Sequence, residues 1–353
     1  MSKKWRNILL PFSLIYSGII RGRNRLYDKQ ILRSASFDFP LLCVGNLALG
    51  GTGKTPMVEY LVKMLQEDYK VATLSRGYKR KTKGFFIANE KTGATDIGDE
   101  PMQIHQKFPQ VTVSVAEERV MGIPQLLLEK PETEVVILDD AFQHREVKAG
   151  LNILLTEYNH LYSDDYLLPA GNLRDSKTSS KRAQIIVVTK CKSDLKKEDK
   201  NKIINELKAL PEQKVYFTKI TYKNPYHLFS KEELVLGKNI EVLLVTGIAN
   251  PKRIEELLKD KVMAYDLMRF KDHYNFHSDD IKEIINRFSK KVNPKKIILT
   301  TEKDAVRLFP FENEFSGAPI FVLPMEHEFL FNASKEFEED VMKFIESFEN
   351  LRR

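Results

Sequence analysis

Short runs of apolar residues, separated by stretches with helical spacing, recur along the first two-thirds of the chain. The runs are continuous rather than alternating, which is typical of strands that helices cover on both faces. Lys54–Asp68, between the first two runs, has apolar residues at helical spacing and predicts a helix. This repetition of strand, helix and strand predicts an α/β fold with a doubly wound, mostly parallel sheet. The expected strands are Pro40–Asn46, Val71–Ser75, Val111–Val115, Val135–Asp139, Asn152–Thr156, Gln184–Thr189 and Val215–Ile220.

A change in composition near residue 222 predicts a second domain. Tyr222–Gly237 mixes Asn, Pro, His and charged residues, as a connection does. We therefore expect a larger domain over residues 36–222 and a smaller α/β domain, with the linker and the C-terminal helix, over residues 223–353. The elements expected in the second domain are strands at Ile240–Thr246, Lys296–Thr300 and Pro319–Pro324, and helices at Lys252–Asp260, Ser278–Ser289 and Lys335–Phe348.

The first 35 residues contain an apolar segment, Ile8–Ile20, with basic residues on both sides. The segment is shorter than the roughly 20 residues that span a bilayer, and arginines stand where a signal peptide would have small residues. The pattern predicts an N-terminal interfacial helix, with its apolar side chains in lipid and its arginines near anionic headgroups. The alternative is a helix packed on the protein's own core. The flanking residues are Lys3, Lys4 and Arg6 on one side and Arg21, Arg23 and Arg25 on the other.

Composition narrows the class of protein. Of 353 residues, 42% are hydrophobic and 30% are charged, which excludes a disordered or fibrous chain and predicts two globular domains. The net charge of +7 is compatible with nucleic acid, an anionic membrane or a phosphorylated substrate as partner. Cys43 and Cys191 do not form a disulfide framework, so we expect a cytoplasmic protein.

A phosphate-binding loop is the strongest chemical signal. Residues 48–55 fit the pattern [G/A]-x4-G-K-[S/T] between a buried strand and a helix. Backbone N–H groups of such a loop surround phosphate oxygens, the lysine reaches the β- and γ-phosphates of ATP, and the threonine hydroxyl binds Mg²⁺. The expected nucleotide-binding residues of the loop are Ala48, Leu49, Gly50, Gly51, Thr52, Gly53, Lys54 and Thr55.

Further charged residues follow other predicted strands. Asp139 and Asp140 end a buried strand and, together with Thr55, are candidate Mg²⁺ ligands because this ion prefers hard oxygen donors. Arg76 and Arg174 also follow strands, so both could meet phosphate at the carboxyl edge of the sheet.

Eight motifs, in this order and spacing, make the chain similar to the tetraacyldisaccharide 4'-kinases, the lipid A 4'-kinases of Gram-negative bacteria. The resemblance covers nearly the whole chain. The motifs are GNLALGGTGKTP (45–56), LSRGY (74–78), GDEP (98–101), LDDAFQHR (138–145), LLPAGNLRD (167–175), VTGIANP (245–251), FKDHY (270–274) and TTEKDAVRL (300–308).

The resemblance implies transfer of the ATP γ-phosphate to the 4'-hydroxyl of a lipid A disaccharide 1-phosphate precursor. It also implies a P-loop NTPase fold, a two-stranded linker to the second domain, and a peripheral, membrane-associating N-terminal helix on the cytoplasmic face of the inner membrane. Asp99 would be the catalytic base and His273 its charged partner, with Lys54, Asp139 and Asp140 completing the catalytic set. Because His273 lies in the second domain, domain closure would complete the site. No protein partner is implied.

Two positions depart from the family pattern. Asp175 replaces a glutamate, which puts a direct metal contact there in doubt, and Lys271 replaces a proline.

Two other classes of function remain open from the residues alone. A P-loop GTPase or ATPase could act as a regulator or chaperone. A guanine-binding element would have a carboxylate two residues after Lys190, and this chain has none there, which favours ATP over GTP. A peripheral membrane or nucleic-acid binding protein could use the basic segments Lys79–Lys83 and Lys177–Arg182. No RNA- or DNA-reading motif is visible, so we expect no nucleic-acid partner.

Overall fold

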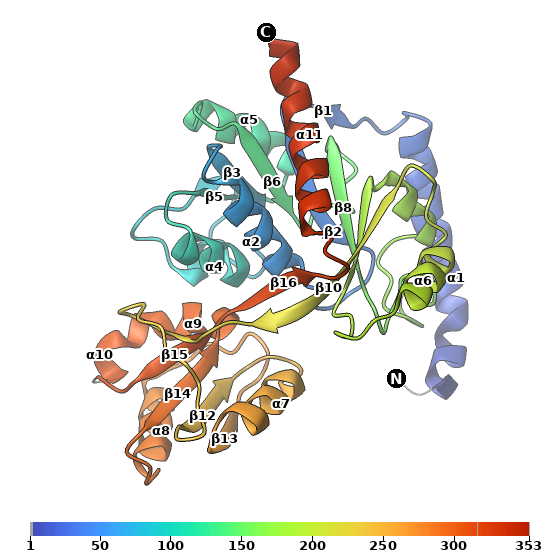
Figure 1. The fold of residues 1–353 in the computed structure, drawn as a ribbon. Helices are drawn as coiled ribbons and strands as arrows, with labels where there is room; N and C mark the ends of the chain where they lie inside the picture. Colours follow the sequence, from blue (N-terminus) through green and yellow to red (C-terminus); the bar gives the residue numbers. More distant parts are fainter. Residues whose placement is uncertain (1–2, 316, 353) are drawn as a thin grey trace.

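A nine-stranded sheet forms the centre of the larger domain in the computed structural model, which describes residues 3–315 and 317–352 (Figure 1). In spatial order its strands are β16 (Met325–Phe329), β10 (Lys214–Tyr222), β9 (Ile185–Thr189), β8 (Leu151–Glu157), β2 (Leu41–Asn46), β6 (Val135–Asp139), β3 (Val71–Ser75), β5 (Thr112–Val115) and β4 (Phe86–Ile87). The strands from β10 to β5 run parallel, while β16 and β4 are antiparallel at the edges. The mostly parallel sheet predicted from the apolar runs is therefore confirmed.

Helices cover both faces of this sheet. Alternate residues of β2 show the two faces, since Leu42 and Val44 belong to one apolar core and Leu41 and Cys43 to the other. Helices α2 (Lys54–Leu65), α4 (Asp99–Lys107) and α11 (Ser334–Arg352) pack on the first core, and α5 (Arg119–Glu129) and α6 (Lys197–Leu207) on the second. The shorter elements of this domain are β1 (Ala35–Ser36) paired with β7 (Val147–Lys148), α3 (Ala94–Ile97) and the 3-10 helix Lys177–Arg182.

The smaller domain has its own sheet and its own core, as predicted from the second set of elements. Within its described residues, five strands stand in the order β11 (Tyr226–His227), β15 (Ile320–Leu323), β14 (Lys296–Thr301), β12 (Glu241–Thr246) and β13 (Ala264–Arg269). Its helices are α7 (Lys252–Lys261), α8 (Ser278–Ser289), α9 (Glu302–Leu308) and α10 (Glu312–Phe315), with a 3-10 turn at Phe309–Phe311. Figure 1 shows this domain at the lower left, joined to the larger one by β10 and β16.

The end of the chain returns to the larger domain. We expected the C-terminal helix to belong to the smaller domain, but β16 pairs with β10 in the nine-stranded sheet. Three residues of α11, Phe337, Val341 and Ile345, are buried in the core that also contains α2. The physical reason is the apolar stripe of α11, which finds its partner surface beside β10 and α2 rather than in the second domain.

The N-terminal helix α1 (Lys3–Asp28) is longer than its apolar segment and lies along one side of the larger domain (Figure 1). Ser13 and Ser17 are buried against the protein, whereas Phe12, Ile15 and Ile19 are each about 60–65% exposed. The helix thus turns Ser13, Ser17 and Ile20 inward and an apolar stripe outward. Among the described helices, none combines the length and apolar character that crossing a membrane requires. The side chains of the basic residues that precede the apolar segment lie outside the described part.

Candidate active site

The predicted phosphate-binding loop connects β2 to α2 at the carboxyl edge of the sheet. Gly50 and Gly53 have φ angles of 111° and 89°, which favour glycine and allow the tight turn. The loop is held from beneath by two side chains. The Asn46 amide donates to the Thr52 hydroxyl at 2.9 Å, and the Thr189 hydroxyl donates to the Thr52 carbonyl at 2.8 Å.

The acidic pair at the end of β6 lies directly beside this loop. Lys54 Nζ is 3.7 Å from Asp140 Oδ1, so the loop lysine and the strand carboxylate form an ion pair. Arg174 donates to both Asp140 oxygens, at 2.8 and 3.2 Å, and to Asn46 Oδ1 at 2.6 Å. The structure thus brings together the phosphate-loop lysine, the acidic pair and Arg174, three groups that lie far apart in the sequence.

The two neighbouring carboxyls have opposite electrostatic environments. Burial and, next, the Asp140 carboxylate raise the pKa of Asp139 to about 7. Burial would also raise the pKa of Asp140, but Lys54 and Arg174 outweigh it and hold that pKa below its ordinary value. Asp139 Oδ1 is buried and has no hydrogen-bond partner in the described part of the chain. An unpartnered buried carboxyl oxygen next to a second carboxylate fits a Mg²⁺ ion.

Asp175 has a structural environment of its own. Its Oδ1 accepts from the Asn24 amide at 2.8 Å and from the Ser176 backbone N–H at 2.7 Å, and its Oδ2 accepts from Arg182 at 3.2 Å. Both carboxylate oxygens therefore have partners that fix the segment after Arg174 against α1. The tie to α1 is a contact that the sequence did not reveal.

Asp99 and His273 meet although they are 174 positions apart. Asp99 begins α4 of the larger domain, His273 follows β13 of the smaller one, and His273 Nδ1 lies 2.7 Å from Asp99 Oδ2. Lys303 Nζ is 3.1 Å from His273 Nε2, and Arg307 donates to Asp99 Oδ2 at 3.2 Å. An ammonium donates only, so Nε2 accepts, and Nδ1 carries the proton that it donates to Asp99.

This network contains more than the resemblance implies. Two cations of the smaller domain belong to it, since Arg307 contacts Asp99 directly and Lys303 contacts the ring of His273. Both cations lie in residues 300–308, a motif that by itself indicates no role for them. The contact across the domains is also already formed, so domain closure is not needed to bring the two groups together.

Arg119 is a site residue that the sequence did not reveal. Its side chain is 2% exposed and reaches the backbone carbonyl of Asp139 at 3.4 Å. Burial and then the charges of Arg119 and Arg76 lower the pKa of His144 to about 4. Arg76 is exposed at the end of β3 and so contributes to the positive potential beside the acidic pair. A single buried arginine at the start of a helix has no pattern that marks it in a sequence.

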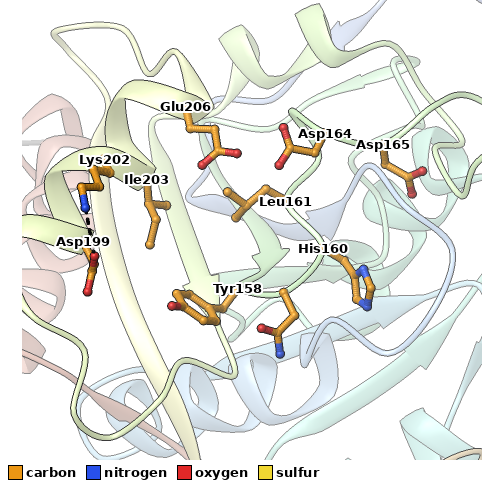
Figure 2. A pocket seen from close by; sticks show the side chains of 10 residues that line it. Tyr158, His160, Leu161, Asp164, Asp165, Asp199, Lys202, Ile203 and Glu206 are labelled. Carbon is orange, nitrogen blue, oxygen red and sulfur yellow. Dashed lines mark ion pairs between the residues drawn. The ribbon is translucent and has the colours of Figure 1, made fainter.

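A separate hollow of about 500 Å³ lies between the end of β8 and α6. Figure 2 shows Asp164 and Glu206 facing each other across it, with Asp199 paired to Lys202 at 3.6 Å. Its lining shares no residue with the phosphate-binding loop within the described chain. The acidic lining disfavours a triphosphate, so this hollow is not the nucleotide site.

Comparison with known proteins agrees with the geometry. The sequence family described as tetraacyldisaccharide-1-P 4'-kinase matches residues 5–346. The chain belongs to this family. A relative from Bacteroides thetaiotaomicron, named tetraacyldisaccharide 4'-kinase, is 47% identical over 99% of this chain and 94% of its own. One from Flavobacterium johnsoniae with the same name is 45% identical over 98% of both chains.

A solved structure of a 4'-kinase gives the same fold. It is LpxK from Aquifex aeolicus in complex with ATP, which is 32% identical, with a TM-score of 0.75, over 97% of this chain and 99% of that one. The prediction of a P-loop kinase of the 4'-kinase family is thereby confirmed. The family assignment favours an enzyme over the regulatory, chaperone or nucleic-acid binding alternatives.

Proposed function

We propose that this protein transfers the γ-phosphate of ATP to the 4'-hydroxyl of a tetraacyldisaccharide 1-phosphate, giving the bisphosphorylated lipid A precursor lipid IVA. The observation that carries the proposal is the contact between Asp99 and His273 across the two domains. Glu100, the neighbour of Asp99, is close enough to Asp139 to contribute to its raised pKa. The candidate base therefore stands at the start of a helix, α4, that lies within electrostatic range of the candidate metal ligands.

The nucleotide would be held by the loop amides and by Lys54. Thr55, Asp139 and Asp140 would hold Mg²⁺, which neutralises phosphate charge when it is bound. Lys54 and Arg174 both rest on Asp140, so their charges are already placed at the loop before nucleotide arrives. Preorganised charge of this kind lowers the barrier because the groups need little reorganisation during the reaction.

Asp99 would accept the proton of the acceptor hydroxyl. Both hydrogen bonds from His273 and Arg307 go to Asp99 Oδ2, so Oδ1 would be the oxygen that accepts the proton. His273 orients the carboxylate. Lys303 donates to Nε2 of the ring, so the proton that faces Asp99 is on Nδ1. The roles follow the usual logic of a base held by a second group that is itself oriented.

The acceptor is a lipid, so the enzyme must work at a membrane surface. The outward face of α1 presents Ile8, Phe12, Leu14, Ile15 and Ile19, each at least 59% exposed. A helix that buries polar residues and exposes such a stripe is suited to lie in the lipid interface. We place the protein as a peripheral enzyme on the cytoplasmic face of the inner membrane.

The decisive experiment supplies labelled ATP, Mg²⁺ and a monophosphorylated lipid A precursor in detergent. A labelled bisphosphorylated lipid is the expected product, and the Asp99→Asn variant should form it much more slowly. ATP hydrolysis or nucleotide-dependent assembly without lipid phosphorylation would instead support a regulator or chaperone.

A further inference from the structure

His327 lies beneath the phosphate loop, on β16 where the chain returns from the smaller domain. The residue is 4% exposed. Its Nε2 lies 2.8 Å from the carbonyl oxygen of Gly53, and its Nδ1 lies 2.9 Å from the Thr218 hydroxyl on β10. A side chain on Gly53 would stand 3.0 Å from the same ring. A strand from the linker is thus in direct contact with the loop, in a way that the reaction scheme above does not use.

The hydrogen-bond partners fix the proton of this ring. A carbonyl oxygen can only accept, so His327 Nε2 carries the hydrogen, and Nδ1 accepts from the Thr218 hydroxyl. Burial lowers the pKa of His327 to about 4, so the ring is neutral at physiological pH. Thr218 is fully buried, which leaves its hydroxyl few alternative partners.

The contact determines the orientation of one peptide group. The Gly53 carbonyl also accepts the first bond of α2, from Met57 N at 3.2 Å. In a planar trans peptide, the carbonyl of Gly53 and the N–H of Lys54 point in opposite directions. With the carbonyl held by His327, the Lys54 N–H points away from the ring, toward the side of the loop where phosphate binds.

Glycine makes this restraint necessary. Gly53 has a φ of 89° and no Cβ, so its backbone resists rotation less than that of other residues, and the hydrogen bonds from Met57 and His327 to its carbonyl hold the peptide. A rotated peptide would present a carbonyl oxygen to phosphate in place of an N–H, which repels an anion.

We propose that His327 is a positioning residue that holds the Gly53–Lys54 peptide in its phosphate-binding orientation. The proposal rests on the assignment of this loop as the ATP site. Because β10 and β16 also connect to the domain that carries His273, His327 links the loop to the same two strands that seat the smaller domain.

The test measures binding of a non-hydrolysable ATP analogue with Mg²⁺ to the full-length protein. His327→Ala should raise the Kd about tenfold, since one lost hydrogen bond of about 1.4 kcal/mol corresponds to that factor. His327→Gln should restore binding to within about threefold, because its amide reaches the Gly53 carbonyl. His327→Asn, which is too short for that contact, should behave like His327→Ala. Glu328→Ala, an exposed neighbour on β16, is the matched control and should leave the Kd unchanged.

A purely structural role makes a different forecast. Equal Kd values for wild type and His327→Ala, or equal losses for the Gln and Asn variants, would overturn the proposal. If His327→Ala fails to fold, Thr218→Val supplies the test, because it frees the ring to turn and should also weaken binding. An unchanged Kd in Thr218→Val would then overturn it. Wild-type protein that fails to bind the analogue would overturn the ATP site itself, whereas analogue binding without lipid phosphorylation would overturn the proposed function alone.

Discussion

At the scale of single residues, Asp139 and Asp140 show how position decides chemistry. They are neighbours in the chain, yet Asp140 is held ionised by Lys54 and Arg174 while the pKa of Asp139 is raised to about 7. Near neutral pH, Asp139 therefore carries a proton for part of the time. The acidic pair has one permanent anion and one carboxyl whose charge changes near pH 7.

This difference predicts a pH-dependent affinity for Mg²⁺. Below about pH 7 the ion must displace a proton from Asp139, so its affinity should fall by up to about tenfold per pH unit and level off above pH 7. Titration calorimetry in two buffers with different ionisation heats measures the released proton. Asp139→Asn should remove the proton release, whereas an affinity that stays constant from pH 6 to pH 8 would contradict the assignment.

The same shift affects stability without metal. The folded protein binds the Asp139 proton more tightly than the unfolded chain does. The contribution of Asp139 to the free energy of unfolding is therefore present below about pH 4 and is lost as the pH rises toward about 7.

The sequence predicts those candidate site residues that belong to a local motif. The glycine-rich loop and the acidic strand end could be predicted from spacing alone, because neighbouring residues carry out their chemistry. The roles of Asp99 and His273 required the family resemblance, since two residues in different domains form no pattern. Arg119 and His327 remained hidden, because burial and tertiary contact determine what a lone arginine or histidine does.

At the scale of elements, α1 differs from an ordinary amphipathic helix because polar residues on its buried face contact the protein while large apolar residues are exposed. Ser13 accepts from Ala170 N and donates to the Leu167 carbonyl, and Tyr16 donates to the carbonyl of Arg174. The segment that α1 holds is the one that places Arg174 on Asp140. The helix therefore combines an exposed apolar stripe with support for the segment that carries Arg174.

Removing residues 1–25 should weaken binding to anionic liposomes but leave the kinase domain folded, because the sheet takes no strand from this segment. Liposome flotation measures the first effect and circular dichroism the second. The double variant Phe12→Ser and Ile15→Ser keeps the inward contacts of the helix and should reproduce the loss of flotation. Equal flotation of the truncated and full-length proteins would show that the anchor lies elsewhere.

At the scale of the whole molecule, a buried ionic cluster connects the two domains. Lys107 of α4 lies 2.7 Å from Glu59 of α2 and 2.6 Å from Glu302 of α9 in the smaller domain. Burial and then the Glu302 carboxylate raise the pKa of Glu59 to about 7. The positive charge of Lys107 thus offsets the repulsion between the two buried carboxylates at the domain junction.

Lys107→Ala should lower the free energy of unfolding by about 3–5 kcal/mol, because it leaves two buried carboxylates without a cation. Urea denaturation measures the change. Lys63→Ala, which breaks the exposed ion pair with Glu326, is the control and should cost less than about 1 kcal/mol. Similar losses in the two variants would show that the cluster does not stabilise the junction.

The contact between Asp99 and His273 across the domains predicts non-additive kinetics. Asp99→Ala and His273→Ala should each lower kcat, with the larger loss for Asp99, and the double variant should be little worse than Asp99→Ala. A double-mutant cycle on kcat, with nucleotide affinity measured in parallel, tests this. Additive losses would reject direct coupling, and an unchanged kcat in Asp99→Ala would reject the base.

Those parts of the architecture that consist of apolar runs or amphipathic helices were predictable from the sequence. The central strands and the helices α2, α7 and α8 follow the predicted positions closely, because burial on both faces or one helical stripe dictates their residues. The return of β16 to the first sheet was not predictable, since Met325–Phe329 is a short edge strand with three consecutive polar residues at its centre. Such a strand matches several partners, and the three-dimensional fold selects one.

The late return of the chain has a consequence for how the protein is made. During synthesis, β10 leaves the ribosome well before β16 and α11, which cover it. Residues 325–345, which complete the first core, appear only after the entire smaller domain has been synthesised. Until then, the edge of the sheet at β10 and the apolar face that α11 covers remain exposed in the nascent kinase domain. Because His327 belongs to this segment, the phosphate loop acquires its support only after the smaller domain has been synthesised.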